Sequence, residues 1–241
     1  MKATLTFILI IFCFFNAKSQ VSREAIPYGV NSDGRLIGVF ENLKNKTKGS
    51  EIKINKISGS PYYNQNFKTA QIGYFGKILK NDIYIRYNAY SDEMEMAKSE
   101  SQTSSEDALI KNRKVTCTIN GYTYKYLEYL NENEPPAVGY VKELFKGNKF
   151  SFYVRETKEY REGVKAKSSL ERSFPARFID KTEYFIAVGN GSLKKTKLSK
   201  KQIVNSLSSY KQEIKNFIYL NKVKLRDSSD VIKLFNFLEK I

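Results

Sequence analysis

Apolar and polar residues alternate through residues 71–98, the stretch with the clearest strand pattern in the chain. Part of this stretch is apolar at every second position: Ile83, Ile85, Tyr87 and Ala89. A period of two is typical of a half-buried strand. Met94 and Met96 continue the alternation in the opposite phase, so one face stays buried only if the chain turns near Ser91-Asp92. The stretch predicts about three short antiparallel strands, with an earlier turn at Asn81-Asp82.

Turn residues recur about every ten residues through most of the chain, which is typical of an antiparallel sheet. Asn120-Gly121 is the strongest hairpin signal, because alternating residues flank it on both sides. Gly147-Asn148 predicts a second hairpin, and Asp180-Lys181-Thr182 predicts a turn between two short strands. Further expected elements are strands at 36–40 and 51–57 and a charged segment at 157–172 that forms a solvated loop or extended strand ends.

The apolar period changes from 2 to 3.6 at Ser199, which predicts helices from there onward. Ser199 and Gln202 form a capping-box pattern, and Ser208-Ser209 predicts a break. Ser228 or Ser229 is expected to cap a last helix. One face of that helix is apolar: Val231, Leu234, Phe235, Leu238 and Ile241. Such a stripe must be buried, most simply against the sheet.

These patterns together predict an α+β fold. Its β part is an antiparallel β-meander, which would form a curled sheet, a sandwich or an open barrel, and two or three C-terminal helices follow it. The expected organisation is a signal peptide at 1–19, a β-rich domain at 20–198, and helices at 199–241 packed on the sheet.

The first residues have the features of a signal peptide. Lys2 supplies a positive charge, an apolar run follows from Leu5 to Phe15, and Ala17-Lys18-Ser19 fits a cleavage site before Gln20. A retained membrane anchor is the less favoured alternative, because the run is short for a membrane span. We therefore expect an exported protein, periplasmic or secreted, with no transmembrane span after cleavage.

The chain has no histidine, which removes the commonest general base and metal ligand. Cys13 would leave with the signal peptide, so Cys117 is the one remaining thiol. Cys117 lies on the apolar face of an expected strand, and we expect it to be buried and inert. No phosphate-binding loop or nucleophile motif is present. We therefore expect no catalytic residue, no metal site and no cofactor.

Positive charge is the strongest compositional feature, with 41 Lys and Arg against 25 Asp and Glu and a formal net charge of +16. Residues 194–241 hold twelve basic and four acidic residues. The densest basic cluster is expected to bind anions: Lys194, Lys195, Lys197, Lys200 and Lys201. An anionic envelope polymer or lipid surface is the expected partner, and a generally cationic, solubilising surface is the alternative. Specific nucleic-acid binding is not expected, because no recognition motif accompanies the charge.

Tyr122, Tyr124 and Tyr126 would line one face of a strand. Such a row would form a platform that stacks on sugar rings or nucleobases, with charge supplied by Lys125 and Arg113. The alternative is ordinary stabilisation of the sheet by cross-strand aromatic pairs.

Asp92, Glu93 and Glu95 form the best acidic cluster. A pair of these carboxylates would bind a cation or perform acid–base chemistry, whereas a solvated strand face opposite Met94 and Met96 is the favoured alternative. The leading functional expectation is a non-catalytic exported protein with a binding or structural role at the cell envelope. A carboxylate-dependent enzyme that acts on a glycan is the alternative.

Several segments resemble uncharacterised exported proteins of the Bacteroidetes. They are Gly59-Ser60-Pro61-Tyr62, Arg86-Tyr87-Asn88-x-Tyr90-x-Asp92-Glu93-Met94-Glu95, Pro175-Ala176-Arg177-Phe178, the C-terminal helix pair, and Ser-Gln at the end of the signal. The resemblance covers most of the mature chain and implies an exported β-rich protein with C-terminal helices. It implies no activity, cofactor or site residue.

Overall fold

The computed structural model describes residues 44–46, 57–105, 107–132, 134–168 and 170–241. The predicted signal peptide at 1–19 and strand at 36–40 lie outside these residues, as does the predicted strand at 51–57 apart from its last residue. The described chain has the expected α+β fold, with one mostly antiparallel sheet of 11 strands followed by three α-helices.

The strands run along the chain as follows: β1 (Lys44–Lys46), β2 (Lys68–Tyr74), β3 (Lys77–Asn88), β4 (Glu93–Ala97), β5 (Asp107–Leu109), β6 (Val115–Ile119), β7 (Tyr122–Leu130), β8 (Ala137–Lys146), β9 (Phe150–Arg161), β10 (Arg177–Val188) and β11 (Leu193–Thr196). Their order across the sheet is β1-β5-β4-β3-β2-β6-β7-β11-β10-β9-β8. Most strands pair with their successor in the chain, so the predicted meander is confirmed.

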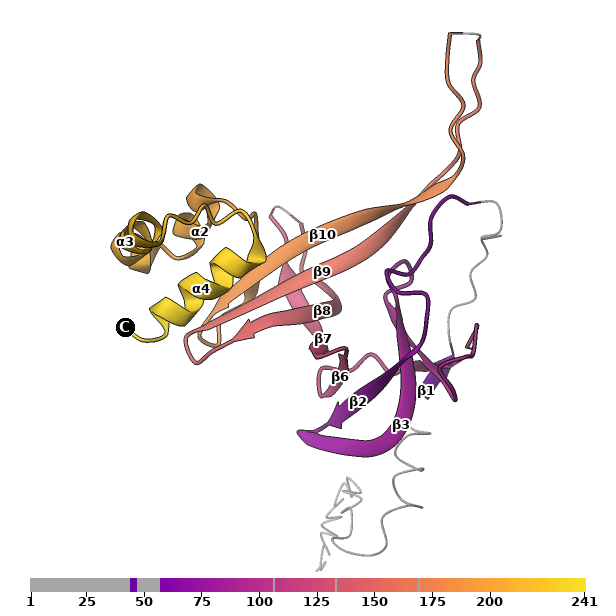
Figure 1. The fold of residues 1–241 in the computed structure, drawn as a ribbon, viewed down its shortest axis with the longest axis horizontal. Helices are drawn as coiled ribbons and strands as arrows, with labels where there is room; N and C mark the ends of the chain where they lie inside the picture. Colours follow the sequence, from indigo (N-terminus) through magenta and orange to yellow (C-terminus); the bar gives the residue numbers. More distant parts are fainter. Residues whose placement is uncertain (1–43, 47–56, 106, 133, 169) are drawn as a thin grey trace, which may run out of the picture.

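Strand β7 joins two parts of the sheet, because it pairs with three other strands. Its residues 122–125 pair with β6, residues 124–129 pair with β8, and residues 129–130 pair in parallel with β11. Strands β8, β9, β10 and β11 also pair in succession, so β7 to β11 close into a ring. We call this unit the five-strand ring, and the remaining strands form an open, curled part of the sheet beside it (Figure 1).

The two parts of the sheet have separate apolar cores. The interior of the ring is filled by residues of all five strands: Tyr129, Val141, Tyr153, Phe185, Ala187 and Leu193. The curled part has its own cluster, which includes Ile72, Ile85, Met94 and Cys117. Cys117 is fully buried, as expected, and burial raises the pKa of its thiol, so it stays protonated and unreactive.

Local turn signals located several hairpins correctly. Asn120-Gly121 connects β6 and β7, and both residues have positive φ angles, 51° and 80°. Gly147-Asn148 lies in the turn between β8 and β9, and Ser91-Asp92 lies in the turn between β3 and β4, as expected.

Two predicted turns are wrong, because both segments lie inside long strands that pair on either side of them or throughout. Asn81-Asp82 lies inside β3, where the register against β2 shifts between Ala70 and Ile72, and the turn is formed by Phe75-Gly76 instead. Residues 180–182 lie inside β10, where each pairs with a residue of β9. The same pairing extends β9 to Arg161, so the first residues of the charged segment at 157–172 form an extended strand end, one of the two alternatives considered for it.

The helices begin close to where the change of period predicts them. They are α2 (Lys200–Ser206), a 3₁₀ turn at Ser208–Tyr210 at the predicted break, α3 (Lys211–Asn221) and α4 (Ser228–Leu238). The Ser199 hydroxyl accepts from the Gln202 N–H at 3.3 Å, as expected. The cap of α4 is Asp227 rather than Ser228 or Ser229, because its carboxylate accepts from the Asp230 N–H at 2.9 Å.

The helices pack on the outer face of β9 and β10, beside the ring (Figure 1). The buried contact surface includes Phe150, Phe152 and Ile186 from the strands and Phe217 and Phe235 from the helices. Alternation along β9 and β10 places these strand residues opposite to those that fill the ring. The C-terminal helices are therefore part of the same folded unit as the sheet.

Glu239 ties the end of α4 to the β8–β9 turn. Its carboxylate accepts from the backbone N–H groups of Asn148, Lys149 and Phe150 at 3.1, 2.8 and 2.9 Å. Burial raises the pKa of this carboxyl, but the three backbone donors lower it by more, so the net pKa lies below the ordinary value.

Glu239→Gln is expected to reduce stability at neutral pH and to have a smaller effect in acid. Because the folded pKa is lower than the unfolded one, the carboxylate stabilises the fold above the unfolded pKa of about 4.3. That contribution is lost as the pH falls through the folded pKa. The difference in urea midpoint between wild type and variant should therefore shrink from about pH 6 to about pH 3. Glu162→Gln, which changes an exposed glutamate, is the control and should leave the urea midpoint unchanged at both pH values. If the effect of Glu239→Gln were the same at both pH values, the lowered pKa of Glu239 would be contradicted.

Candidate functional site

Arg86 on β3 lies at the centre of a buried polar network. Its guanidinium carbon is 3.9 Å from the ring centroid of Tyr62 and 4.2 Å from that of Phe67, so the planar group is held between two aromatic rings. Its Nε and Nη2 atoms donate to Glu95 Oε2 at 3.1 and 2.6 Å. The guanidinium is therefore both stacked and ion-paired inside the protein.

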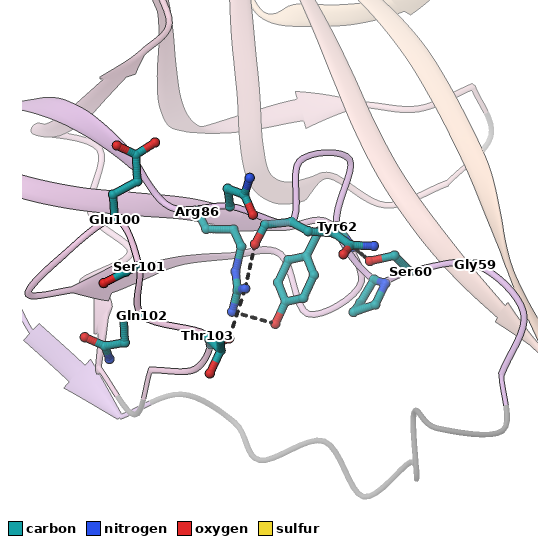
Figure 2. A pocket seen from close by; sticks show the side chains of 11 residues that line it. Gly59, Ser60, Tyr62, Arg86, Glu100, Ser101, Gln102 and Thr103 are labelled. Carbon is teal, nitrogen blue, oxygen red and sulfur yellow. Dashed lines mark hydrogen bonds between the residues drawn. The ribbon is translucent and has the colours of Figure 1, made fainter.

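The remaining donors of Arg86 are also engaged. Nη1 donates to the carbonyl oxygens of Gln65 and Thr103 at 2.8 and 3.2 Å, and Nη2 reaches the Tyr62 hydroxyl at 3.1 Å (Figure 2). Glu95 in turn accepts from the hydroxyl of Tyr62 and from the Asn88 side-chain amide at 2.8 Å. These hydrogen bonds hold the loop that contains Tyr62 and Gln65 against one face of β3 and β4.

The expectation of a solvated acidic face on β4 is wrong, because Glu93 and Glu95 are each only 5% exposed. The segment around Tyr62 covers this face, and Arg86 provides the counter-charge that a buried Glu95 requires. The carboxylate of Glu95 is thus committed to structural hydrogen bonds, which leaves it poorly placed for chemistry on a substrate.

Asp92 is held by a different set of partners from Glu95. It accepts from the Tyr87 hydroxyl at 2.6 Å and from the backbone N–H of Tyr140 at 3.3 Å, and it lies 3.4 Å from Arg155 Nη2. Gly139 provides the space, because a Cβ there would lie 2.7 Å from Asp92 Oδ2. Asp92 therefore connects the curled part of the sheet to the ring.

A broad hollow, which we call the polar basin, opens beside Arg86 and has a volume of about 760 Å³ (Figure 2). Hydroxyl, amide and carboxylate groups provide most of its side-chain lining: Ser60, Gln65, Asn66, Glu100, Ser101, Gln102 and Thr103. Glu100 is ion-paired with Lys68 on β2. The basin offers many neutral hydrogen-bonding groups and few unpaired charges.

A second, narrower hollow of about 290 Å³ lies where β7 leaves β6 and begins to pair with β8. We call it the aromatic hollow, because four tyrosines line it: Tyr63, Tyr87, Tyr122 and Tyr124. Its polar lining comes from six side chains in addition to Arg86: Asn64, Asn66, Lys68, Asn120, Lys142 and Glu156. Asn66 and Arg86 also line the polar basin, so the two hollows adjoin.

The structure brings two members of the predicted tyrosine row into this hollow and places the third elsewhere. Tyr122 is 50% exposed, and the ring of Tyr124 lies 5.7 Å from that of Tyr87 on β3. Tyr126 packs on Tyr140 at 5.2 Å, as a sheet-stabilising pair. Tyr126 therefore has the sheet-stabilising role considered for the row, and stacking of Tyr122 and Tyr124 on a ligand stays a prediction.

The charge beside the tyrosines comes from Lys142 and not from the expected Lys125 and Arg113. Lys142 Nζ lies 4.9 Å from the Tyr122 ring centroid and 2.6 Å from Glu156 Oε2. Lys125 points to the opposite face of β7, because successive strand residues alternate, and it pairs with Glu143. Arg113 pairs with Glu128 at 2.8 Å on the surface.

The two half-buried tyrosines of the hollow, Tyr87 and Tyr124, remain neutral. Burial, with a smaller effect from Glu156, raises the pKa of Tyr124, and burial together with Asp92 raises the pKa of Tyr87. Their phenol groups stay protonated at physiological pH, so the hollow presents uncharged ring faces next to the ammonium group of Lys142.

The predicted anion-binding lysines lie around β11 and the start of α2. Lys194, Lys197, Lys200 and Lys201 are exposed, whereas Lys195 is half-buried and ion-paired with Glu183. Burial raises the pKa of Glu183, but hydrogen bonding to Lys195 and the charge of Lys181 lower it by more, so the net pKa lies below the ordinary value. Lys194 and Lys195 point to opposite faces of β11 by strand alternation. Both line a hollow of about 680 Å³ with Gln202 and Asn205 of α2, and anion binding there stays a prediction.

Two residues of the aromatic hollow, Tyr87 and Lys142, carried no signal of a site in the sequence, whereas Tyr63 is open to the same two interpretations as the tyrosine row. Tyr63, Tyr87 and Lys142 come from a loop, from β3 and from β8, and only the pairing of β7 with β6 and β8 brings them together. Within the described ranges, no group of three or more Cys, Asp or Glu side chains is placed to hold a metal ion.

In the part of the chain that the structure describes, no helix has both the length and the apolar character needed to span a membrane. Comparisons with models of protein families, with curated proteins and with solved structures gave no match.

Proposed function

We propose that this protein is an exported, non-catalytic binding protein of the cell envelope, and that the aromatic hollow holds a sugar unit of an anionic glycan. The observation that carries the proposal is the convergence of four tyrosine rings, three asparagine side chains and two lysines in one hollow beside a polar basin. The predicted signal peptide supports the location.

The chemistry of the two hollows matches that of a sugar polymer. The apolar C–H face of a sugar ring packs on an aromatic face such as that of Tyr122, and its hydroxyl groups exchange hydrogen bonds with amides. A carboxylate or phosphate on the same sugar would meet Lys142, which lies over the Tyr122 ring and would share its ammonium group between the ligand and Glu156. The adjoining basin would receive the next unit of the chain through its hydroxyl and amide groups.

The proposal is for binding rather than hydrolysis, because the carboxylates near the hollows are engaged. Glu95 is bound to Arg86, while Glu100 and Glu156 are ion-paired with Lys68 and Lys142. A glycosidase requires one carboxyl that donates a proton and a second that acts on the sugar or on water. Each of these three carboxylates already has a basic partner, so none of the three is free to serve in such a pair.

Tyr122→Ala is expected to weaken binding of an acidic polysaccharide about tenfold, the loss expected from one aromatic stacking contact. Affinity for hyaluronate would be measured by titration calorimetry, with neutral dextran for comparison. Tyr219→Ala is the matched control, because Tyr219 is 82% exposed and lies on α3, far along the chain from the hollow. Tyr122 is itself half exposed, so its loss should leave thermal unfolding nearly unchanged.

Two outcomes would reject the aromatic hollow as the site. One is equal binding by the Tyr122→Ala variant and wild type. The other is loss of binding when all five lysines from Lys194 to Lys201 are changed to Gln while Tyr122→Ala has no effect, which would assign the polymer to the basic cluster instead.

A further inference from the structure

Strands β9 and β10 continue beyond the ring as a projecting hairpin, which we call the arm (residues 162–175; Figure 1). Val164 and Phe174 exchange two backbone hydrogen bonds of 2.8 Å, and the Glu171 N–H donates to the Ser168 carbonyl at 3.2 Å near the far end. Every described residue of the arm is exposed. The arm therefore reaches away from both cores of the protein.

The arm carries large apolar side chains that the described chain leaves in water. Leu170 near its end is 94% exposed, and Val164 and Phe174 are 58% and 49% exposed. Val164 and Phe174 are directly paired, so their side chains lie on the same face of the hairpin. A two-stranded hairpin is marginal in water without a surface to cover it. Exposed apolar groups on such an element indicate a contact site.

The charges around Leu170 point to an anionic partner. Lys165, Lys167 and Arg172 lie in the arm, and Arg161 and Arg177 lie at its base. Three acidic residues oppose these five: Glu162 and Glu171 in the arm, and Glu159 at its base, which is ion-paired with Arg161 at 3.4 Å. The Glu171 carboxylate already accepts from the Lys167 backbone N–H at 2.7 Å. A second copy of the chain is disfavoured as the partner, because each copy has a formal net charge of +16.

We infer that the arm docks on an anionic lipid bilayer and inserts Leu170 at the boundary between headgroups and acyl chains. Lys167 and Arg172 lie within three residues of Leu170, or about 10 Å of extended chain, which places them at the depth of the lipid phosphates. Basic residues near an anionic surface and an apolar side chain below it are the two signals that stable peripheral binding needs. This inference does not rest on the proposed sugar site.

The test is co-sedimentation of the processed chain, from Gln20 onward, with vesicles of phosphatidylcholine containing phosphatidylglycerol. Leu170→Ser is expected to lower partitioning about tenfold, through loss of one buried leucine side chain. Changing Lys165, Lys167 and Arg172 to Gln is expected to lower it about a hundredfold at low salt. Vesicles of phosphatidylcholine alone should bind weakly.

The matched controls lie on α3, at the other end of the molecule (Figure 1). Leu220→Ser changes another highly exposed leucine, at 74%, and the triple change of Lys211, Lys215 and Lys222 to Gln removes the same charge. Both controls should retain most of the binding. The inference is overturned if either control loses as much binding as its arm counterpart, or if Leu170→Ser partitions like wild type. It is also overturned if wild type is a dimer in solution that Leu170→Ser dissociates, because the arm then serves a second copy.

Discussion

Replacing Arg86 with Met is expected to lower the free energy of unfolding by about 3–5 kcal/mol, the cost of leaving one partner of a buried ion pair alone. Both side chains of the Arg86–Glu95 pair are almost fully buried, with 6% and 7% of their surface exposed. Without Arg86, the Glu95 carboxylate keeps the neutral donors Tyr62 and Asn88 but loses its counter-charge. Urea unfolding followed by far-ultraviolet circular dichroism measures the change.

A double-mutant cycle identifies the source of this effect. Glu95→Met alone leaves the Arg86 guanidinium buried without its carboxylate, and the double variant removes both charges. The double variant should therefore cost less than the sum of the two single variants, by more than about 1 kcal/mol.

Arg113→Met is the matched control, because the Arg113–Glu128 pair has a similar N–O distance, 2.8 Å, on the surface. It should cost at most about 1 kcal/mol. If the costs of the two single variants at Arg86 and Glu95 simply added in the double variant, the ion pair would not be the source of the lost stability.

Phe235→Ala is expected to destabilise the protein by about 3–5 kcal/mol, because it creates a cavity between the helices and the sheet. The side chain is fully buried and stacks on Phe150 at 5.1 Å, with further ring contacts to Phe145 and Phe152 at 5.7 and 5.9 Å. No other side chain of α4 has ring contacts with three strand residues among those described. The loss should weaken the attachment of all the helices to the ring.

Phe237→Ala, two residues along the same helix, is the control for Phe235→Ala. Phe237 is only half-buried and contacts Phe217 of α3 at 5.2 Å, so its loss should cost clearly less. Hydrogen exchange separates local from global effects: for Phe235→Ala, amides of α3 and α4 should lose protection before those of the ring strands. Equal costs for the two variants would contradict the assignment of Phe235 as the main anchor of the helices.

Local signals in the sequence were sufficient for the fold class and for several boundaries. Asn120-Gly121 is found in a hairpin turn because its preferred positive φ angles form there regardless of distant contacts. Gly147-Asn148 also lies in a hairpin turn, as its residue types predict. Ser199 marks the start of the helices because its hydroxyl satisfies a free N–H within the same turn. The same signals failed at Asn81-Asp82 and at residues 180–182. At residues 180–182 a neighbouring strand satisfies the backbone, and pairing overrides a local preference for turns. At Asn81-Asp82 the strand continues through an irregular stretch, because β3 pairs with β2 on either side of it.

The sequence by itself determined which residues share a strand face, such as Tyr122 with Tyr124, and that an apolar helix face must be covered. Only the tertiary structure decided what each face meets. The parallel pairing of β11 with β7 closes the ring, and the pairing of β11 with β10 places Lys195 beside Glu183. The pairing of β7 with β6 and β8 leaves Tyr122 and Tyr124 beside Tyr87 of β3. These contacts join residues far apart in the chain, and alternation in a strand is the same whether the facing surface is water, an arginine or another sheet.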